Sequence, residues 1–110
     1  MNESILTSIK KLLGITEEYK HFDTDIVIHI NTVFMILMQL GVGPETGFTI
    51  SDDTSVWGDF LTSSAQLEAV KSYVYLRVRM LFDPPQGSVA TSMENLIKEL
   101  EFRLNVEVDK

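Results

Sequence analysis

Cysteine is absent from the 110-residue chain, which excludes disulfide bonds and thiolate metal sites. The fold must therefore be held by its own apolar core. With 45% hydrophobic residues, a chain of this length can bury roughly 65% of its unfolded surface. We find no internal repeat, linker or low-complexity tract, so the sequence predicts one domain over residues 1–110.

Basic residues are scarce: nine lysines and arginines stand against sixteen aspartates and glutamates, a formal net charge of −7. Binding to a phosphate backbone depends on cations, so this balance disfavours a nucleic-acid-binding domain. The one basic and aromatic cluster comprises Lys71, Tyr73, Tyr75, Arg77 and Arg79. We interpret it as packing and pairing with carboxylates, with nucleic-acid contact as the alternative.

Signals for export or membrane insertion are also missing. The N-terminus has neither a basic region nor a long apolar stretch. Residues 26–43 come nearest to a membrane span, but they contain His29, Asn31, Thr32 and Gln39, and no basic flank follows them. We therefore expect no membrane contact. The absence of cysteine fits a protein of the cytoplasm.

The most hydrophobic stretch begins at Asp25 and runs for sixteen residues. At 3.6 residues per turn it leaves one narrow polar line, formed by Asp25, His29, Thr32 and Gln39. We expect such a helix to be covered almost all round. The sequence thus predicts an all-α fold, a small bundle of four to five helices around a central buried helix at about 24–41.

Three further helices are predicted at residues 3–13, 65–82 and 88–104, because apolar residues recur there at three- and four-residue spacing. Asn2 or Ser4 would cap the first of them.

Helix ends carry local signals. Asp23 or Thr24 would cap the central helix, and the sequence Ser63–Gln66 fits a capping box. Lys10 and Lys11 lie in the last turn of the first helix, where they oppose the negative end of its dipole.

Residues 44–62 have the least regular pattern. Phe48 and Ile50 alternate with a polar residue, so we expect either a short hairpin or an irregular loop here. Trp57 favours a plug for the helical core over a ligand platform. The tail 105–110 also alternates, which predicts either a frayed end or an added strand.

No catalytic or metal-binding constellation is present. Nucleophilic catalysis needs a nucleophile, a base and a group that orients the base, and the only imidazoles are His21 and His29. Asp25 and His29 share a helix face and form half a metal site, but no third ligand is indicated. We expect no enzyme activity, no cofactor and no metal.

Two weaker motifs have simpler explanations. The glycines of residues 41–47 are spaced G-x-G-x-x-x-G after a helix instead of a strand, so they indicate a helix stop and not a phosphate loop. The acidic pairs at 17–18 and 52–53 lack the alternating oxygen ligands and closing glutamate of a calcium loop. They are interpreted as solvated loop charges.

Five segments, taken in order, carry a family resemblance. They are Ile9-Lys-Lys-Leu-Leu-Gly-Ile15, Phe22-Asp-Thr-Asp-Ile-Val-Ile-His-Ile-Asn31, Gln39-Leu-Gly-Val-Gly43, Ala69-Val-Lys-Ser-Tyr-Val-Tyr-Leu-Arg-Val-Arg-Met-Leu-Phe-Asp-Pro-Pro85 and Glu99-Leu-Glu-Phe-Arg-Leu-Asn105. Together they resemble the small head–tail connector proteins (head-completion or adaptor proteins) of tailed bacteriophages and prophages, particularly those of Gram-positive hosts.

The resemblance implies an all-α fold of four or five helices, assembled as a closed ring beneath the portal. The ring would extend the channel through which the genome leaves the capsid. The implied partners are copies of the chain itself, the portal protein and a tail-side connector or stopper protein, with DNA only as passing cargo. The implied place is the head–tail junction of the virion, after assembly in the cytoplasm of the bacterial host. Catalysis and cofactors are not implied.

The residues support this picture in two ways. Carboxylates repel phosphates, so an acidic chain suits a conduit that DNA passes without binding. Apolar residues in the loop and tail also suggest surface reserved for neighbours, and the candidate interface residues are Phe48, Ile50, Trp57, Val106 and Val108. The alternative is a generic helical protein-interaction or regulatory module of a phage or bacterium.

Overall fold

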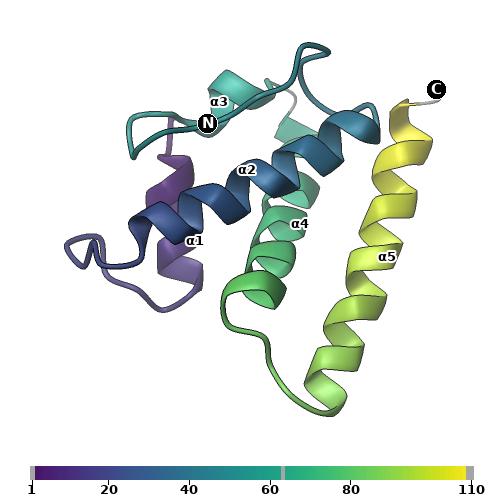
Figure 1. Cartoon of the computed structure of the whole chain (residues 1–110). Helices are drawn as coiled ribbons and strands as arrows, with labels where there is room; N and C mark the ends of the chain where they lie inside the picture. The colour runs from purple at the N-terminus through teal and green to yellow at the C-terminus, as the bar shows by residue number, and fades with distance from the viewer. Residues whose placement is uncertain (1, 63, 109–110) are drawn as a thin grey trace.

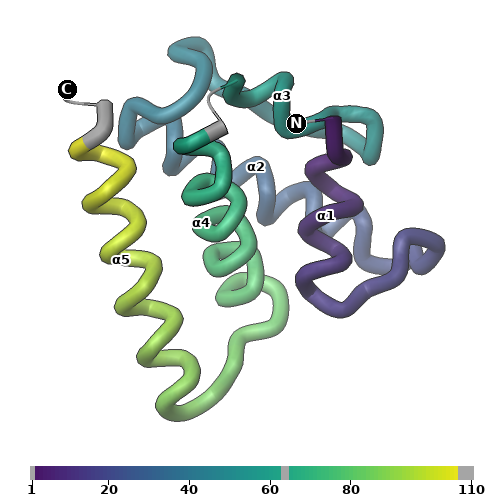
Figure 2. The backbone as a smooth tube through the Cα atoms, turned by 180° about the vertical axis from the view of Figure 1, so that it is seen from behind, coloured from purple at the N-terminus to yellow at the C-terminus, as the bar shows by residue number. Residues whose placement is uncertain are grey.

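The computed structural model describes residues 2–62 and 64–108 and confirms the all-α prediction, a small helical bundle. The elements are α1 (Ile5–Leu12), α2 (Asp23–Gln39), α3 (Trp57–Phe60), α4 (Ser64–Phe82) and α5 (Ser88–Val108). Helix α2 crosses the front of the molecule in Figure 1, and α4 lies behind it, with the short α1 on one side and the long α5 on the other (Figures 1 and 2).

The core lies chiefly between α2 and α4, whose inner faces carry more than half of its buried apolar side chains, while α3 adds the largest one, Trp57. α1 closes one side of it with Ile5 and Ile9, and α5 closes the other with Ile97 and Leu104. Full burial of such a side chain is worth about 1.5–3 kcal/mol. The buried residues of the two inner helices are Ile26, Ile30, Val33, Phe34, Leu37, Leu67, Val70, Tyr73, Val74, Leu76 and Val78.

The cover over α2 is less complete than the sequence led us to expect. Ile28 is 56% exposed and Met35 is 50% exposed. They are seven residues apart, which places them two turns apart on one outer face. The prediction that this helix is covered almost all round is therefore wrong for the single subunit.

Residues 44–62 form the irregular loop with a short helix, and no hairpin is present in the part of the chain that the structure describes. The loop is anchored to α2 because the Asn31 side chain donates to the Ile50 carbonyl at 2.9 Å and accepts from the Ile50 amide at 2.8 Å. At the start of this loop, the backbone passes close to the Phe60 ring. Gly43 has φ +87°, and a Cβ there would lie 2.4 Å from the Phe60 ring, so only glycine fits.

The ends of α2 and α5 differ from prediction. Phe22 occupies the N-cap of α2 without a side-chain hydrogen bond, so neither Asp23 nor Thr24 caps the helix. α5 continues through Val108 instead of fraying or forming a strand after residue 104. Its last turns stay on the bundle because Leu104 is buried and the Asn105 amide donates to the Leu40 carbonyl at 3.3 Å. The proposed cap residue Ser63 lies outside the described residues.

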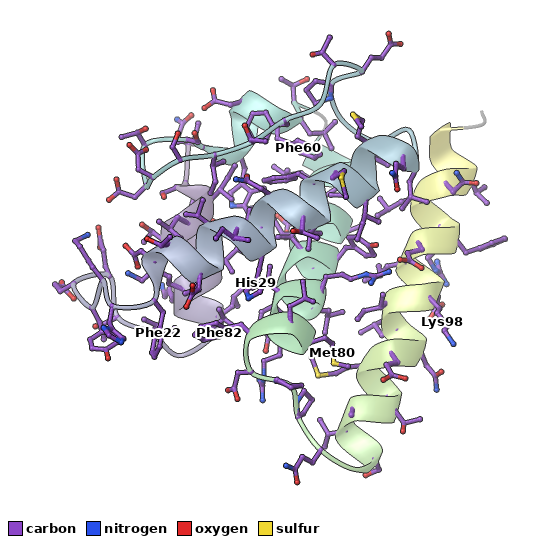
Figure 3. The ribbon with its side chains drawn as sticks, viewed as in Figure 1. Phe22, His29, Phe60, Met80, Phe82 and Lys98 are labelled. Carbon is purple, nitrogen blue, oxygen red and sulfur yellow. The ribbon has the colours of Figure 1, made fainter. Side chains whose placement is uncertain are left out.

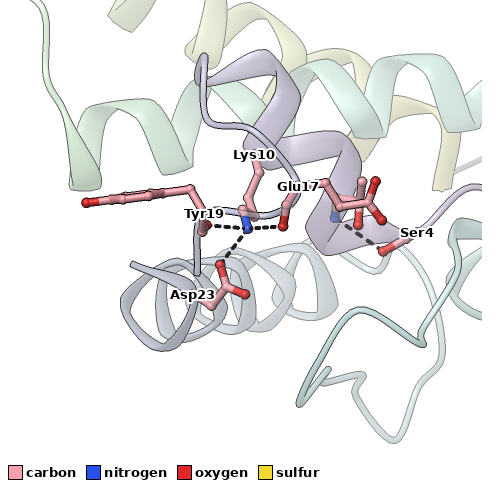
Figure 4. Close-up of polar contacts among 6 residues, drawn as sticks. Ser4, Lys10, Glu17, Tyr19 and Asp23 are labelled. Atoms are coloured by element: carbon pink, nitrogen blue, oxygen red, sulfur yellow. Dashed lines mark hydrogen bonds and ion pairs between the residues drawn. The ribbon is translucent and has the colours of Figure 1, made fainter. Parts of the chain in front are cut away.

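Lys10 is buried and binds the chain that follows α1 (Figure 4). Its ammonium donates to the carbonyls of Glu17 at 3.2 Å and Tyr19 at 2.7 Å, and it lies 2.7 Å from Asp23 Oδ1. Among the described residues, the ammonium is the one partner of that carboxylate oxygen. Lys10 therefore fixes the α1–α2 connection, a role beyond the helix-dipole pairing expected from sequence. Ser4 caps α1 by accepting from the Thr7 amide at 3.2 Å, which settles the choice between Asn2 and Ser4.

Replacing Lys10 with methionine should lower the free energy of unfolding by about 2–4 kcal/mol, because it leaves a largely buried carboxylate and two carbonyls without their cation. Urea unfolding followed by circular dichroism measures this change. The matched control is Lys11→Met at the neighbouring exposed position, for which a change within about 0.5 kcal/mol is expected. Equal effects of the two substitutions would contradict the assigned role of Lys10.

Candidate interaction surfaces

The five candidate interface residues do not share one surface. Ile50 and Trp57 are buried in the core, so assigning their side chains to an exposed interface was wrong for the single subunit. Trp57 plugs the helical core, and its indole nitrogen donates to the Ser8 hydroxyl at 2.9 Å. Val106 is exposed near the end of α5, and the side chain of Val108 lies outside the described part of the structure.

Phe48 is half-buried. Its ring packs edge-on against Phe34 and Phe60, with centroid distances of 5.2 and 5.4 Å. Its remaining surface faces a groove between the outer side of α2 and residues 46–49. Of the five candidates, Phe48 and Val106 are therefore the ones with described side chains that reach the surface.

We call this depression the α2 groove and define it by Ile28, Thr32, Met35, Met38 and Phe48. Its surface is mostly apolar. It was not predicted, because α2 was expected to be covered almost all round. The exposed side of α2 instead includes Thr32 and Gln39 of the polar line, with Ile28 and Met35 beside them. Asn31, the amide outside that line, turns toward the loop.

A second exposed apolar feature lies on α5. Phe102 is 70% exposed and Val106 is 38% exposed, and they are one turn apart on the side of the helix away from Ile97 and Leu104. We call this pair the α5 ridge. The sequence offered a signal here too, because Phe102 is an aromatic residue among the charged positions of an otherwise amphipathic helix.

The predicted basic and aromatic cluster on α4 is taken up by contacts within the subunit. The Tyr73 hydroxyl donates to Glu101 Oε2 at 2.6 Å, and Arg77 donates both to that same oxygen and to the Tyr73 hydroxyl, the latter at 3.1 Å. Lys71 lies 5.9 Å from the Trp57 ring centre, and Arg79 donates to the Asp83 carbonyl at 2.6 Å. These contacts favour the interpretation as packing and carboxylate pairing.

The Tyr73–Arg77–Glu101 cluster joins α4 to α5 and shifts the acidity of its members. Burial, with a hydrogen bond to Glu101, raises the pKa of Tyr73 to about 12. Burial alone would raise the pKa of Glu101, but the hydrogen bonds from Tyr73 and Arg77 outweigh it and hold that pKa below the ordinary value of 4.5. The ionised carboxylate therefore stabilises the α4–α5 contact.

Three features considered from the sequence remain: His29, a possible metal site and a possible membrane span. His29 is half-buried near the Phe82 ring, at a centroid distance of 6.5 Å, and Phe82 also packs on Phe22 (Figure 3). In the described residues, no three groups of metal-ligating type gather, and no helix is both long and apolar enough to cross a membrane.

The family model described as phage connector protein matches residues 5–110, essentially the whole chain. The chain belongs to this family. The match confirms the resemblance carried by the five sequence segments. No curated protein and no solved structure matches the chain. As a phage connector protein it is a component of the virion that associates with other phage head or tail proteins.

The Glu101 contacts predict a pH-dependent stability of the connector. A carboxylate whose pKa is lowered by folding contributes stability above its unfolded-state pKa and loses it as the pH falls through the folded-state value. Replacing Glu101 with glutamine should cost about 1 kcal/mol at pH 7, discounted for partial exposure, and this difference from wild type should shrink as the pH falls below 4.5.

Urea unfolding at several pH values measures the difference. Glu99→Gln is the matched control, because Glu99 is an exposed glutamate of the same helix that pairs with Arg103 across one turn. It should change stability by less than about 0.5 kcal/mol at every pH. A Glu101→Gln cost that stays constant down to pH 3 would contradict the charge-based explanation.

Proposed function

We propose that this phage connector protein is the subunit of a closed ring beneath the portal. The ring extends the DNA channel and helps to join head to tail. Its partners are further copies of the chain, the portal protein and a tail-side connector or stopper protein. The role is structural and not enzymatic. Assembly takes place in the cytoplasm of the bacterial host, and the finished ring resides at the head–tail junction.

The observation that carries this proposal is the combination of family membership with two separate exposed apolar features on one subunit. An isolated domain gains nothing from exposing Ile28, Met35 and Phe102 to water, whereas an assembled subunit covers such side chains with a neighbour. Two different surfaces on one chain suit a head-to-tail contact, and such contacts produce rings when the rotation between subunits closes.

The charge supports a channel that DNA passes without stopping. A net charge of −7 per subunit accumulates with every copy in a ring, and the resulting field repels phosphates. The cations of α4 that would have opposed this effect are held close to carboxylates of the same subunit, as in the pairs Arg77–Glu101 and Arg79–Asp83.

Native mass measured across a range of protein concentrations tests the ring. We expect a discrete species whose mass is a multiple of the 12.5 kDa subunit and exceeds a dimer, either alone or with portal protein added. A tight dimer that persists at all concentrations would instead favour the generic interaction module, because two-fold closure leaves no route to a ring. A chain that stays monomeric even with portal present would overturn the proposal.

DNA binding tests the passive channel. Titration of the assembled protein with double-stranded DNA at 50 and 200 mM salt should give no measurable binding at either concentration. Cationic sites would reveal themselves by tight binding that weakens steeply, by roughly 10³-fold or more, between these salt concentrations. Such a result would show that the acidic balance does not describe the surface that DNA meets.

A further inference from the structure

We infer that neighbouring subunits meet by seating the α5 ridge of one copy in the α2 groove of the next. This inference rests on the proposed ring and specifies which two surfaces form its repeating contact. It is argued from the shape of the two surfaces, from their apolar side chains and from the charges that surround them.

The α2 groove is a prepared surface with two fixed walls. One wall is the outer face of α2 with Ile28 and Met35, and the other is the segment carrying Phe48. The double hydrogen bond between Asn31 and Ile50 holds the second wall at its distance from α2. Methionine at positions 35 and 38 supplies flexible thioether side chains that adapt to an incoming apolar group.

The α5 ridge has a shape that fits into such a groove. α5 packs on α4 through Ile97 and Leu104, yet it also carries Phe102 and Val106 on its other side. A helix with apolar side chains on two sides is typical of one that lies between two partners. Its own subunit covers only the first of these sides, and Figure 1 shows α5 along the edge of the molecule with α4 on one flank only.

The charges around the two surfaces differ in balance, the groove side being the more acidic. Nine of the sixteen carboxylates precede residue 63, against three of the nine cations. Asp52 and Asp53 lie with Ile28 and one cation, Lys20, in the depression adjoining the α2 groove, and Asp25 is exposed one turn before Ile28, so carboxylates outnumber cations here. Beside the α5 ridge, the exposed cation Lys98 lies one turn before Phe102, and Arg103 lies next to it, paired with Glu99 of the same helix.

This asymmetry favours a second copy in head-to-tail orientation over a two-fold pairing of grooves. Pairing groove with groove would bring the carboxylates of positions 25, 52 and 53 against their own copies, and like charges in an interface cost free energy. Figure 1 shows α2 across the front and α5 along the side. The groove lies on the outer face of α2, and the ridge lies on the face of α5 opposite Ile97 and Leu104, so the two are separate surfaces. Successive contacts then turn the chain of subunits, as a ring requires.

Cross-linking between introduced cysteines tests the contact directly, and the absence of native cysteine makes it specific. Met35→Cys is mixed with Phe102→Cys and treated with a short bis-maleimide reagent. We expect a mixed dimer at least about tenfold more abundant than the mixed product of Leu12→Cys with Phe102→Cys. Leu12 is the control because it is also exposed, at 54%, but lies on α1. The double variant Met35→Cys with Phe102→Cys should give a ladder of linked oligomers.

A second measurement uses charge. Met35→Glu and Phe102→Glu alter exposed positions, so each variant should keep the wild-type unfolding midpoint in urea. Each alone should require at least about tenfold more protein to assemble than wild type, since a carboxylate would have to be buried in the contact. An equimolar mixture should form a heterodimer, because each pair retains one intact groove and one intact ridge.

The outcomes separate this contact from the ring itself. Rings in native mass without a 35–102 cross-link would overturn the inference and leave the proposed function standing. A link from position 35 to added portal protein, with none to position 102, would also overturn it, because the groove would then be occupied by the portal. Absence of both rings and cross-links, with portal present, would overturn both proposals.

Discussion

Two hydrogen bonds between the Asn31 amide and the backbone of Ile50 set the position of the least regular part of the chain. Each is worth only about 1 kcal/mol net. Their effect is larger than that figure suggests, because the amide matches one residue of the loop and so fixes the register of the whole segment. On the far side of Ile50 the chain delivers Trp57 and Phe60 into the core, and on the near side it places Phe48 as a groove wall. The same two hydrogen bonds therefore position two core side chains and one wall of the groove.

The helical fold was predictable because it follows from the local spacing of apolar residues. Four of the helices lie close to their predicted positions, since apolar spacing and proline after α4 act within a few residues. The tail was misread because Val106 and Val108 alternate with polar residues. Leu104 is instead buried in the core and Asn105 binds the Leu40 carbonyl, and both contacts involve residues distant in sequence. The same holds for Lys10, whose partners on the next connection no spacing rule reveals.

The candidate surface was predictable only in part, for a physical reason. Hydrophobicity states that a side chain avoids water, but not whether its own chain or a neighbour covers it. Ile50 and Trp57 were therefore named as interface candidates although the loop folds them inward, where Trp57 forms the core plug that the sequence also favoured. Ile28 and Met35 were assigned to the interior although they are exposed. A helix in which apolar residues exceed what one subunit can cover is the pattern common to α2 and α5.

Assembly of such a subunit depends on a balance between charge and apolar contact. Copies that each carry a net charge of −7 repel one another over roughly 8 Å at physiological salt, the distance at which ions screen them. The α2 groove and the α5 ridge gather several of the exposed apolar side chains, whereas others, such as Leu12 and Val89, lie apart from them. In the proposed contact, seating Phe102 beside Met35 would bury apolar surface of both copies and bring Lys98 toward the carboxylates near the groove. In the proposed ring, the acidic surface would oppose the pairing of groove with groove more than the head-to-tail contact, so specificity would arise from repulsion as well as from attraction.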